Sequence, residues 1–431
     1  MKSFDPSSNR IAVLGLGYVG LPLSLLLARN FLVTGFDIDE NRISSIKNSV
    51  SPIEEPGIND LLLSEAIRKN ITFTSNPDDI SHATVKIITV GTPFDLSTKY
   101  IDYSQIESSL SLLKNRIHRG DIIILKSTVP PGTTNDIVRD RILKMGLRVP
   151  EDIGLIFSPE RMVEGQAIND FLTLPKVIGA SDPETMEIGK KIIGYLGGTV
   201  IEVSTIEAAE MVKMVDNYSR YVFLALTNEI ALACEKIGAD VIEVINAAKT
   251  DYPRNAGILK PGPGVGGSCL NKDPFILEAS MKKLNLDLKM VKSAEIVNRK
   301  MAEHVSRLVK KFSGKRRKVV VAGVAFKGDT NDTRFSTTYE IEEDLKASGY
   351  DVKLSDPYVV ERTRIGRDIY QNCKDREVIL LMTDHSQYTK LDLKKIKDLM
   401  AKEPLILDMR AIIPKNSAEE AGFEYHGLGR L

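Results

Sequence analysis

Short, continuous apolar runs alternate with helical patterns along the N-terminal part of the chain. The runs are too short for helices and apolar throughout, and they lie at residues 11–14, 31–36, 85–90, 122–126, 153–157 and 177–179. Such runs are typical of strands that are buried on both faces of a parallel sheet. Segments between them, such as 21–30, carry apolar residues at helical spacing. The alternation predicts a doubly wound α/β domain over residues 1–204.

The pattern changes character twice further along the chain. Residues 205–314 read as mostly helical, with long helices over 207–237 and 290–312 and a glycine-rich interruption at 262–267. Strand-like runs then return at 319–324, 351–355, 378–382 and 405–407, with a helix predicted over 337–348. We therefore predict an α/β protein with two Rossmann-like doubly wound domains, 1–204 and 315–431, joined by a central helical domain over 205–314. The basic run 315–318 reads as a solvated linker.

Composition narrows the class of protein without naming a function. Lys plus Arg and Asp plus Glu both number 58, and this balance argues against a nucleic-acid partner, although it allows a local cationic pocket. No apolar run approaches the ~18–20 residues of a membrane span, so no membrane association is expected. The N-terminus is polar, and three widely spaced cysteines without a CxxC pair fit a cytoplasmic protein with reduced thiols. Scattered histidines give no metal-site spacing.

A glycine motif links the first predicted strand to the first helix. In Gly15-Leu-Gly-Tyr-Val-Gly20, the first glycine allows a tight turn, Gly17 lets the backbone approach a pyrophosphate, and Gly20 permits close packing of helix and strand. Asp37 ends the next strand and is placed to accept from both ribose hydroxyls, and its charge favours NAD over NADP. The alternative is a strand–turn–helix without a cofactor, in which Asp37 caps a helix.

Other residues extend the predicted cofactor site. Tyr18 and Val19 lie inside the glycine turn, and Arg42 is close enough in sequence to Asp37 to accommodate the 2′-phosphate of NADP instead. Thr92 and Thr128 follow two other predicted strands, and ligands of open α/β sheets lie outside the carboxyl ends of strands. Each threonine could equally be a helix cap or a turn residue.

Cys269 is the candidate nucleophile. It lies in Gly266-Gly-Ser-Cys-Leu-Asn-Lys-Asp273, just before a predicted helix and near Lys272, where the pKa of a thiol is expected to fall. The alternative is a small buried core cysteine, which is the interpretation given to Cys234 and Cys373.

Charged and polar residues near the predicted strands and helices are further candidates. Lys213 interrupts an apolar helical run and shares a helix face with Asn217; the alternative for Lys213 is a surface position. Glu160 and Glu164 follow the strand at 153–157, where a carboxylate pair could transfer protons. The alternative for these acids is a helix cap or an ion pair.

Taken together, the motifs resemble the UDP-glucose/GDP-mannose dehydrogenase family over essentially the whole chain. They occur in the family's order and spacing, and they are Gly15–Pro22, Gly91–Pro93, Ser127–Thr133, Ser158–Arg161, Glu207–Lys213 with Asn217, Gly266–Asp273 and Phe326–Arg334.

The resemblance implies an NAD-dependent four-electron oxidation of C6 of a nucleotide sugar, from alcohol to carboxylate, with two NAD+. It implies a thiohemiacetal and then a thioester on Cys269, with Lys213 and Asn217 stabilising the oxyanion. It gives Asp273 a part in proton transfer with Lys213 and a water, and Glu160 and Thr128 the task of holding or activating that water.

The same resemblance implies substrate contacts and a partner. Lys327 and Arg334 would contact the UDP-sugar from the second α/β domain, as fixed cations suited to a pyrophosphate. The other residues implied in sugar binding are Glu160, Arg161, Glu164, Lys213, Asn217 and Gly266. A homodimer or higher homo-oligomer is expected, with Arg254 reaching a neighbour's site.

Fewer residues indicate which branch of the family, and therefore which sugar substrate, the chain resembles. Ser158–Arg161, Pro261–Gly267 and Asp273-Pro274 resemble the branch that acts on UDP-N-acetylhexosamines, and Pro261–Gly267 most resembles UDP-N-acetylmannosamine enzymes. Lys272 instead resembles the UDP-glucose branch. The alternatives are therefore UDP-glucose or UDP-N-acetylglucosamine 6-dehydrogenases. Outside the family, they are a two-electron β-hydroxyacid-type dehydrogenase and a non-catalytic nucleotide-binding scaffold.

Overall fold

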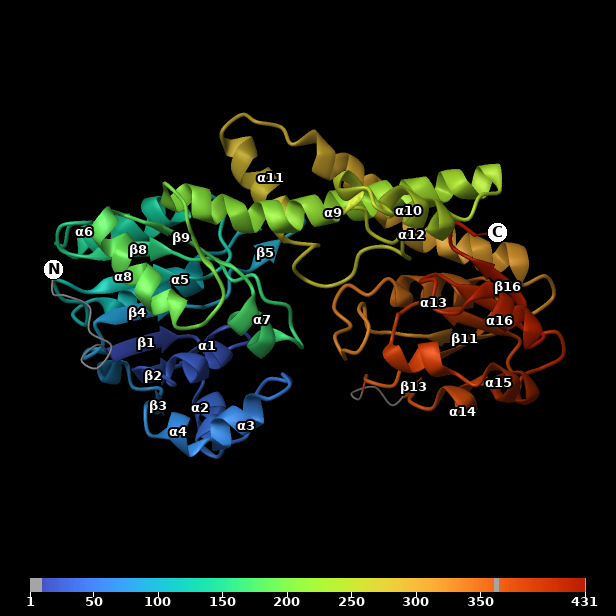
Figure 1. Ribbon diagram of the computed structural model, residues 1–431, viewed down its shortest axis with the longest axis horizontal. Coiled ribbons are helices and arrows are strands. Elements are labelled where there is room, and N and C mark those ends of the chain that lie inside the picture. Colours follow the sequence, from blue (N-terminus) through green and yellow to red (C-terminus); the bar gives the residue numbers. More distant parts are fainter. Residues whose placement is uncertain (1–9, 360–363, 431) are drawn as a thin grey trace. The chain divides into compact units, whose positions relative to one another are not determined.

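A computed structural model describes residues 10–359 and 364–430 (Figure 1). The chain divides into two compact units. The first runs to Asp216 and includes residues 279–284, and the second takes residues 217–278 and 285–431. The central helical region is thus shared between the units, and the predicted boundaries of three domains stay a prediction.

The first unit is built on a mostly parallel sheet with the strand order β10-β9-β8-β7-β4-β1-β2-β3. Only the β8–β9 pair is antiparallel among the described strand pairs of this sheet. The strand bounds are β1 Arg10–Leu14, β2 Leu32–Phe36, β3 Ile71–Thr74, β4 Val85–Ile88, β7 Ile122–Leu125, β8 Gly154–Phe157, β9 Lys176–Ala180 and β10 Val200–Glu202. The predicted strands are confirmed, while β3 and β10 were not predicted.

Apolar cores lie on both faces of this sheet. Along β1, Ile11 and Val13 join one buried cluster, and Ala12 and Leu14 join another, because successive strand side chains point to opposite faces. This explains why the strands read as continuous apolar runs. The helices of the unit are α1 Gly20–Leu27, α2 Glu40–Lys47, α3 Ile58–Leu63, α4 Glu65–Arg68, α5 Ser104–Leu113, the π-helix η2 Thr134–Arg139, α6 Asp140–Lys144, α7 Ala167–Thr173 and α8 Pro183–Gly194. A 3-10 helix, η1 Pro77–Ile80, and a small hairpin, β5 Phe94–Asp95 with β6 Tyr100–Ile101, complete it.

The second unit contains a parallel sheet with the strand order β13-β12-β11-β14-β15-β16. Its strands are β11 Lys318–Ala322, β12 Asp351–Ser355, β13 Ile365–Gly366, β14 Val378–Leu381, β15 Leu405–Asp408 and β16 Glu424–Gly427. Its helices include α13 Thr338–Ala347, α14 Ile369–Cys373, η4 Ser386–Lys390, α15 Leu393–Leu399 and α16 Lys415–Glu420. The predicted second α/β region is confirmed.

Long helices connect and cover these sheets. The helix α9, Ile206–Ile237, begins in the first unit and continues into the second (Figure 1). It is followed by α10 Val241–Lys249, η3 Pro253–Asn255, α11 Asp273–Lys283 and α12 Lys289–Phe312. In the second unit, Ala231 of α9 and Met301 of α12 share one buried cluster with Val319 of β11. The two predicted long helices are confirmed within one residue at each end.

The basic run 315–318 connects α12 to β11, and Lys315, Arg317 and Lys318 are exposed to solvent, as predicted. Arg316 forms an ion pair with Glu424 at 2.8 Å, and the guanidinium of Arg317 lies 5.0 Å from the ring centroid of Tyr350. The backbone N–H groups of Arg317 and Lys318 donate to Glu377. These contacts attach the exposed connection to the second sheet.

Two general features hold for the described residues, 10–359 and 364–430. Helices in these ranges are not long and apolar enough to cross a membrane. No group of three or more His, Cys, Asp or Glu side chains in them is arranged to hold a metal ion.

Candidate active site

The glycine turn between β1 and α1 has the geometry that dinucleotide binding requires. Gly15 adopts a φ of +93°, and its N–H donates to the Phe36 carbonyl at 2.8 Å. A Cβ on Gly20 would lie 1.8 Å from the Gly15 oxygen, so helix and strand approach too closely for any other residue. A Cβ on Gly17 would meet nothing within 4 Å, so this backbone faces open space beside the first turn of α1. That space and the helix N-terminus suit a pyrophosphate.

Asp37 is held rigidly at the end of β2. It is 4% exposed, and its Oδ2 accepts from the Leu16 N–H at 2.7 Å and from the Arg42 guanidinium at 2.8 Å. Asp39, not Asp37, caps α2, so the helix-cap alternative for Asp37 was wrong. Arg42 is engaged by the carboxylate that a 2′-phosphate would have to approach. The turn and this acid therefore fit NAD.

The other predicted cofactor residues lie on the same edge of the first sheet. Thr92 follows β4 and is buried, while Thr128 follows β7 and is half-buried; Tyr18 and Val19 are half-buried in the glycine turn. Because β7, β4 and β1 are neighbours, their carboxyl ends meet at one edge. A hydrogen bond from Ser127 Oγ to the Val90 carbonyl at 2.6 Å joins the segments that carry the two threonines.

Glu160 is an ion-paired acid that also holds the loop after it. Its Oε1 accepts the N–H groups of Arg161 and Met162 at 2.9 and 3.1 Å. Its Oε2 lies 3.3 Å from the ammonium of Lys126, whose side chain is fully buried. The ion pair that the sequence left open as an alternative is observed, and a part of Glu160 in the reaction stays a prediction; Lys126, at the end of an apolar strand, was not singled out. Glu164 follows in the next loop and is half-buried.

Arg161 forms an ion pair with an acid on α9. Its Nε and Nη2 donate to the two carboxylate oxygens of Asp216 at 2.7 and 3.1 Å. This bidentate geometry is the strong form of an arginine–carboxylate contact. Arg161 therefore attaches the loop after β8 to α9, the helix that also carries Lys213 one turn earlier, where Lys213 is half-buried.

Exposure separates the three cysteines. Cys234 and Cys373 are buried, and burial raises the pKa of both thiols, that of Cys373 to about 12. Cys269 is exposed in a turn, and its carbonyl accepts the N–H groups of Lys272 and Asp273 at 3.2 and 2.8 Å. The helix α11 begins at Asp273, so the predicted position just before a helix is confirmed.

The thiol loop is fixed to the segment that follows β11. A Cβ on Gly266 would lie 2.3 Å from the Cβ of Phe326, so only glycine allows this packing. The Gly267 N–H donates to the Arg334 carbonyl at 2.9 Å, and the Asn271 side chain donates to the Gly267 carbonyl at 2.9 Å. The loop of Cys269 is thereby joined to the segment that carries Lys327 and Arg334.

Asn217 and Asp273 meet in the second unit. The Asn217 amide donates to Oδ2 of Asp273 at 2.6 Å, and Asp273 is 1% exposed. The ammonium of Lys272 lies 3.8 Å from Oδ1 of the same carboxylate. The structure thus brings Asn217, Asp273 and the turn of Cys269 together.

The remaining predicted cations differ in their surroundings. Lys327 is half-buried, and its carbonyl accepts from Thr330. Arg334 forms close contacts to both carboxylate oxygens of Asp332, the nearest at 2.6 Å. Arg254 is exposed in η3, with its guanidinium 5.9 Å from the ring centroid of Tyr252. Its predicted reach into a neighbouring subunit stays a prediction.

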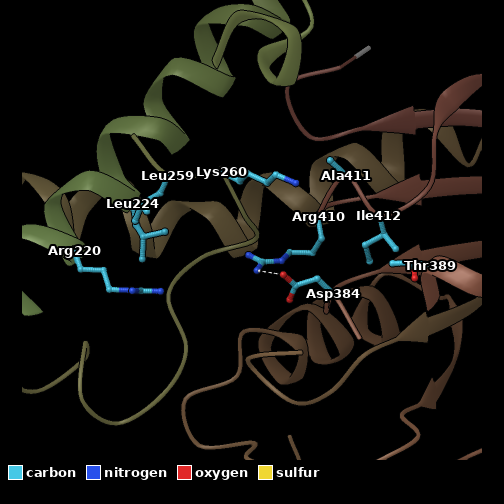
Figure 2. A pocket seen from close by; sticks show the side chains of 9 residues that line it. All are labelled: Arg220, Leu224, Leu259, Lys260, Asp384, Thr389, Arg410, Ala411 and Ile412. Atoms are coloured by element: carbon cyan, nitrogen blue, oxygen red, sulfur yellow. Dashed lines mark hydrogen bonds and ion pairs between the residues drawn. The ribbon is translucent and has the colours of Figure 1, made fainter. Parts of the chain in front are cut away.

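A cavity of about 290 Å³ lies in the second unit (Figure 2). Among the described residues that line it, cationic side chains come from α9, from the segment before the thiol loop and from the end of β15; they are Arg220, Lys260 and Arg410. Asp384 pairs with Arg410 at 3.0 Å (Figure 2). Sequence reasoning missed these cations because the fold alone brings them together. The one available signal was that Arg410 follows the carboxyl end of a predicted strand.

Models of one protein family match three successive parts of the chain. Three domains of one family match in order: the NAD binding domain at residues 9–196, the central domain at 207–300 and the UDP binding domain at 320–415. The chain belongs to the UDP-glucose/GDP-mannose dehydrogenase family. It is therefore an NAD-dependent nucleotide-sugar dehydrogenase, and the resemblance drawn from its motifs is confirmed.

Individual relatives of this dehydrogenase cover nearly its whole length. A UDP-N-acetyl-D-mannosamine dehydrogenase from Methanocaldococcus jannaschii is 33% identical, over 98% of this chain and 96% of the relative. The UDP-glucose 6-dehydrogenase TuaD of Bacillus subtilis is 31% identical, over 98% and 93%. The solved structure of a UDP-D-ManNAc dehydrogenase from Pyrococcus horikoshii has a TM-score of 0.87 and 31% identity, covering 98% of this chain and 99% of the other.

Proposed function

We propose that this dehydrogenase oxidises C6 of a UDP-N-acetylhexosamine, specifically UDP-N-acetylmannosamine, to the carboxylate through a thioester on Cys269. The observation that carries the proposal is the cluster of Asn217, Asp273 and the turn of Cys269, in which the Asn217 amide donates to the Asp273 carboxylate at 2.6 Å. The exposed thiol of Cys269 provides a nucleophile, the Asn217 amide an oxyanion donor and the buried Asp273 carboxylate a proton acceptor.

The first oxidation converts the C6 alcohol to an aldehyde. The glycine turn and Asp37 would hold NAD+, which would supply the hydride acceptor for each of the two oxidations. Asp273, with Lys213 and a water, receives the proton of the C6 hydroxyl. The Cys269 sulfur then bonds to C6, and the aldehyde oxygen takes up the thiol proton, which gives a thiohemiacetal.

The second oxidation removes the remaining hydride and one proton and leaves a thioester. A water held by Glu160 and Thr128 adds to C6, the C6–S bond breaks, and the carboxylate leaves as the thiol is restored. Asn217 has a second amide N–H besides the one donated to Asp273, and together with Lys213 it stabilises the oxyanion of the thiohemiacetal and of the hydrolysis.

The cationic cavity supports binding of the UDP portion. Arg220, Lys260 and Arg410 provide the positive charge that two phosphates require, and Arg410 is kept in place by Asp384. Lys327 and Arg334, on the segment joined to the thiol loop, complete the proposed set with Arg161, Glu164 and Gly266. Within the family, the motifs at Pro261–Gly267 and the Methanocaldococcus jannaschii and Pyrococcus horikoshii relatives favour an acetamido sugar over glucose.

We also propose that the active assembly is a homodimer or higher homo-oligomer in which Arg254 reaches a neighbouring subunit. The domain roles proposed are NAD binding by residues 1–204, catalysis and assembly by 205–314, and UDP-sugar binding by 315–431.

A substrate panel tests the sugar and the electron count together. The purified enzyme is given NAD+ with UDP-N-acetylmannosamine, UDP-N-acetylglucosamine or UDP-glucose, and NADH formation is followed by absorbance. We expect the highest kcat/KM with UDP-N-acetylmannosamine and two NADH per sugar consumed. An equal or greater kcat/KM with UDP-glucose would reject the acetamido branch, and one NADH per sugar would reject the four-electron reaction.

Replacing the thiol tests the covalent step. Cys269→Ser should abolish uronate formation, with kcat falling by about a thousandfold or more, because an alkoxide is a poor substitute for a thiolate in this role. Binding of NAD+, measured by calorimetry, should stay within about twofold of the unsubstituted enzyme, since Cys269 is not in the glycine turn. Cys234→Ala, which removes a buried thiol, is the matched control and should retain activity. Normal uronate formation by Cys269→Ser would exclude the thioester.

A further inference from the structure

Glu210 is a fully buried carboxylate on α9 that the proposed reaction does not use. Its Oε2 accepts the Gly132 N–H at 2.6 Å, and its Oε1 accepts the N–H and the hydroxyl of Thr134 at 2.8 and 2.6 Å. Both partners belong to the segment that leads from β7 into the π-helix η2. A single side chain therefore holds the backbone of this segment against α9.

The two ends of this contact carry predicted active-site residues. Thr128 lies in the same segment, four residues before Gly132. Lys213 lies three residues after Glu210 on α9, and residues at this spacing share a helix face. Displacing the segment relative to α9 would therefore move Thr128 relative to Lys213.

We propose that Glu210 is a positioning residue for the oxidation, whose carboxylate holds the Thr128 segment in register with the turn of α9 that carries Lys213. The inference rests on the proposed function, which places Thr128 and Lys213 at the reacting carbon. Glu210 acts through these two residues and touches no substrate.

The contact should depend on the protonation of Glu210. Burial raises the pKa of Glu210 to about 7, against the lowering effect of the hydrogen bonds from Thr134 and Gly132. The titratable groups that act on it are Glu207 on α9 and Tyr103 before α5, and Asp136 in η2 acts in turn on Tyr103. A protonated carboxyl would turn an O–H toward the N–H and hydroxyl donors of the segment, so the contact weakens as the pH falls below about 7.

Glu210→Gln tests the proposal, because glutamine has the same shape but turns an NH2 group toward backbone N–H donors. We expect kcat to fall by about tenfold to a hundredfold, with the KM for both substrates within about threefold, as small displacements of positioned groups have that effect. The kcat of the unsubstituted enzyme should rise with pH through about 7, as Glu210 ionises, and this limb should be missing from Glu210→Gln. Glu207→Gln is the matched control. Glu207 lies on the same helix and accepts from the Asn135 side chain of the π-helix, with no hydrogen bond to the backbone of the Thr128 segment among the described residues, so kcat should stay within about threefold.

Thr134→Ala provides a second readout that a purely structural contact would not change. It removes one hydrogen bond to the ionised carboxylate and leaves the backbone bonds, so the pH limb should move to higher pH. If Glu210→Gln does not fold, the pH profile of Thr134→Ala still tests the proposal. An unsubstituted enzyme without activity on nucleotide sugars would reject the proposed function. An active enzyme whose kcat and pH limb are unchanged in Glu210→Gln, or whose limb does not move in Thr134→Ala, would reject the role of Glu210.

Discussion

The two sheets of this dehydrogenase begin with nearly the same turn, and the differences show how one of them binds a dinucleotide. Gly15 and Gly323 both adopt positive φ values, +93° and +101°, directly after the first strand of their sheets. Each donates its N–H to the last residue of the neighbouring strand at 2.8 Å, Phe36 in one case and Ser355 in the other. The backbone frame of a dinucleotide turn is therefore present in both units.

The next positions of the two turns differ. Gly17 faces open space, whereas its counterpart Ala325 is 1% exposed and donates its N–H to Asp356. In the first unit α1 begins at Gly20, but in the second the chain continues past Gly328 as a loop until α13 begins at Thr338. The second turn thus lacks both the space and the helix N-terminus that a pyrophosphate requires.

The acids that follow the second strand of each sheet, Asp37 and Asp356, also have different surroundings. Asp356 is fully buried, and its carboxylate accepts from His385 Nε2 at 3.1 Å and from backbone N–H groups on both sides, those of Val324, Ala325, Tyr358 and Val359. The Asp329 N–H donates to Nδ1 of His385 at 2.9 Å, which makes Nε2 the protonated ring nitrogen. Asp356 thus holds its loops together with four backbone hydrogen bonds, while Asp37 accepts two backbone N–H groups, those of Leu16 and Asp39, and the guanidinium of Arg42.

Exchanging each acid for its amide should separate these two roles, and the larger effect is expected in the second unit. Asp356→Asn turns an NH2 group toward buried N–H donors, and we expect the free energy of unfolding to fall by about 3 kcal/mol. The measurement is chemical denaturation of the purified protein. NAD+ affinity should stay unchanged, and a loss of NAD+ affinity without loss of stability would contradict the assignment.

Asp356 should also make the stability of the fold depend on pH. Burial acts to raise the pKa of Asp356, but His385 and the backbone N–H groups hold it below its usual value of 3.8. An acid with a lowered pKa stabilises the fold above its unfolded pKa and loses that contribution as the pH falls through the folded pKa. The stability difference between Asp356→Asn and the unsubstituted protein should therefore be constant near neutral pH and shrink only below about pH 4.

Gly17→Ala makes the first turn resemble the second and is expected to have the next largest effect. The new Cβ meets no protein atom within 4 Å, so stability should stay within about 1 kcal/mol. NAD+ affinity should fall by about tenfold to a hundredfold, because the methyl group occupies the space reserved for the pyrophosphate. Calorimetric titration with NAD+ checks this, and unchanged affinity would place the dinucleotide elsewhere.

Asp37→Asn should have the smallest effect of the three. The amide oxygen can still accept from Leu16, but the negative charge near the ribose is lost. We expect NAD+ affinity to fall by about fivefold to tenfold and discrimination against NADP+ to weaken, as a charge-assisted hydrogen bond is replaced by a neutral one. Comparing the dissociation constants of NAD+ and NADP+ tests it. A variant that still rejects NADP+ to the original extent would assign the discrimination to another residue.

Strands that are buried on both faces were predictable from sequence, and strands at the edges were not. The apolar runs of β1, β7 and β11 predicted their positions, because both faces lie in cores. Edge strands such as β3, with the sequence ITFT, and β16, with EYHG, carry polar residues on an exposed side and leave no continuous run. Their pairing depends on neighbours that the local sequence does not specify.

The candidate site divides in the same way. The glycine turn and the thiol loop were predictable because glycines at fixed spacing report local backbone geometry. Arg220, Lys260 and Arg410 are far apart in sequence, and only the packing of α9 and β15 in one unit brings them to a common cavity. The buried pair of Glu160 and Lys126 was hidden for a related reason, since a lysine that ends an apolar strand looks like a surface residue.

The unequal exposure of the three thiols determines which of them can react with thiol reagents. Two thiols are buried with raised pKa values, so they exist almost entirely as unreactive S–H groups at neutral pH. An alkylating reagent in solution should therefore encounter one accessible thiol per chain, that of Cys269. If the thioester forms there, modification of that one thiol would abolish the activity of a molecule whose fold is otherwise intact, and the number of modified cysteines would equal the number of lost active sites.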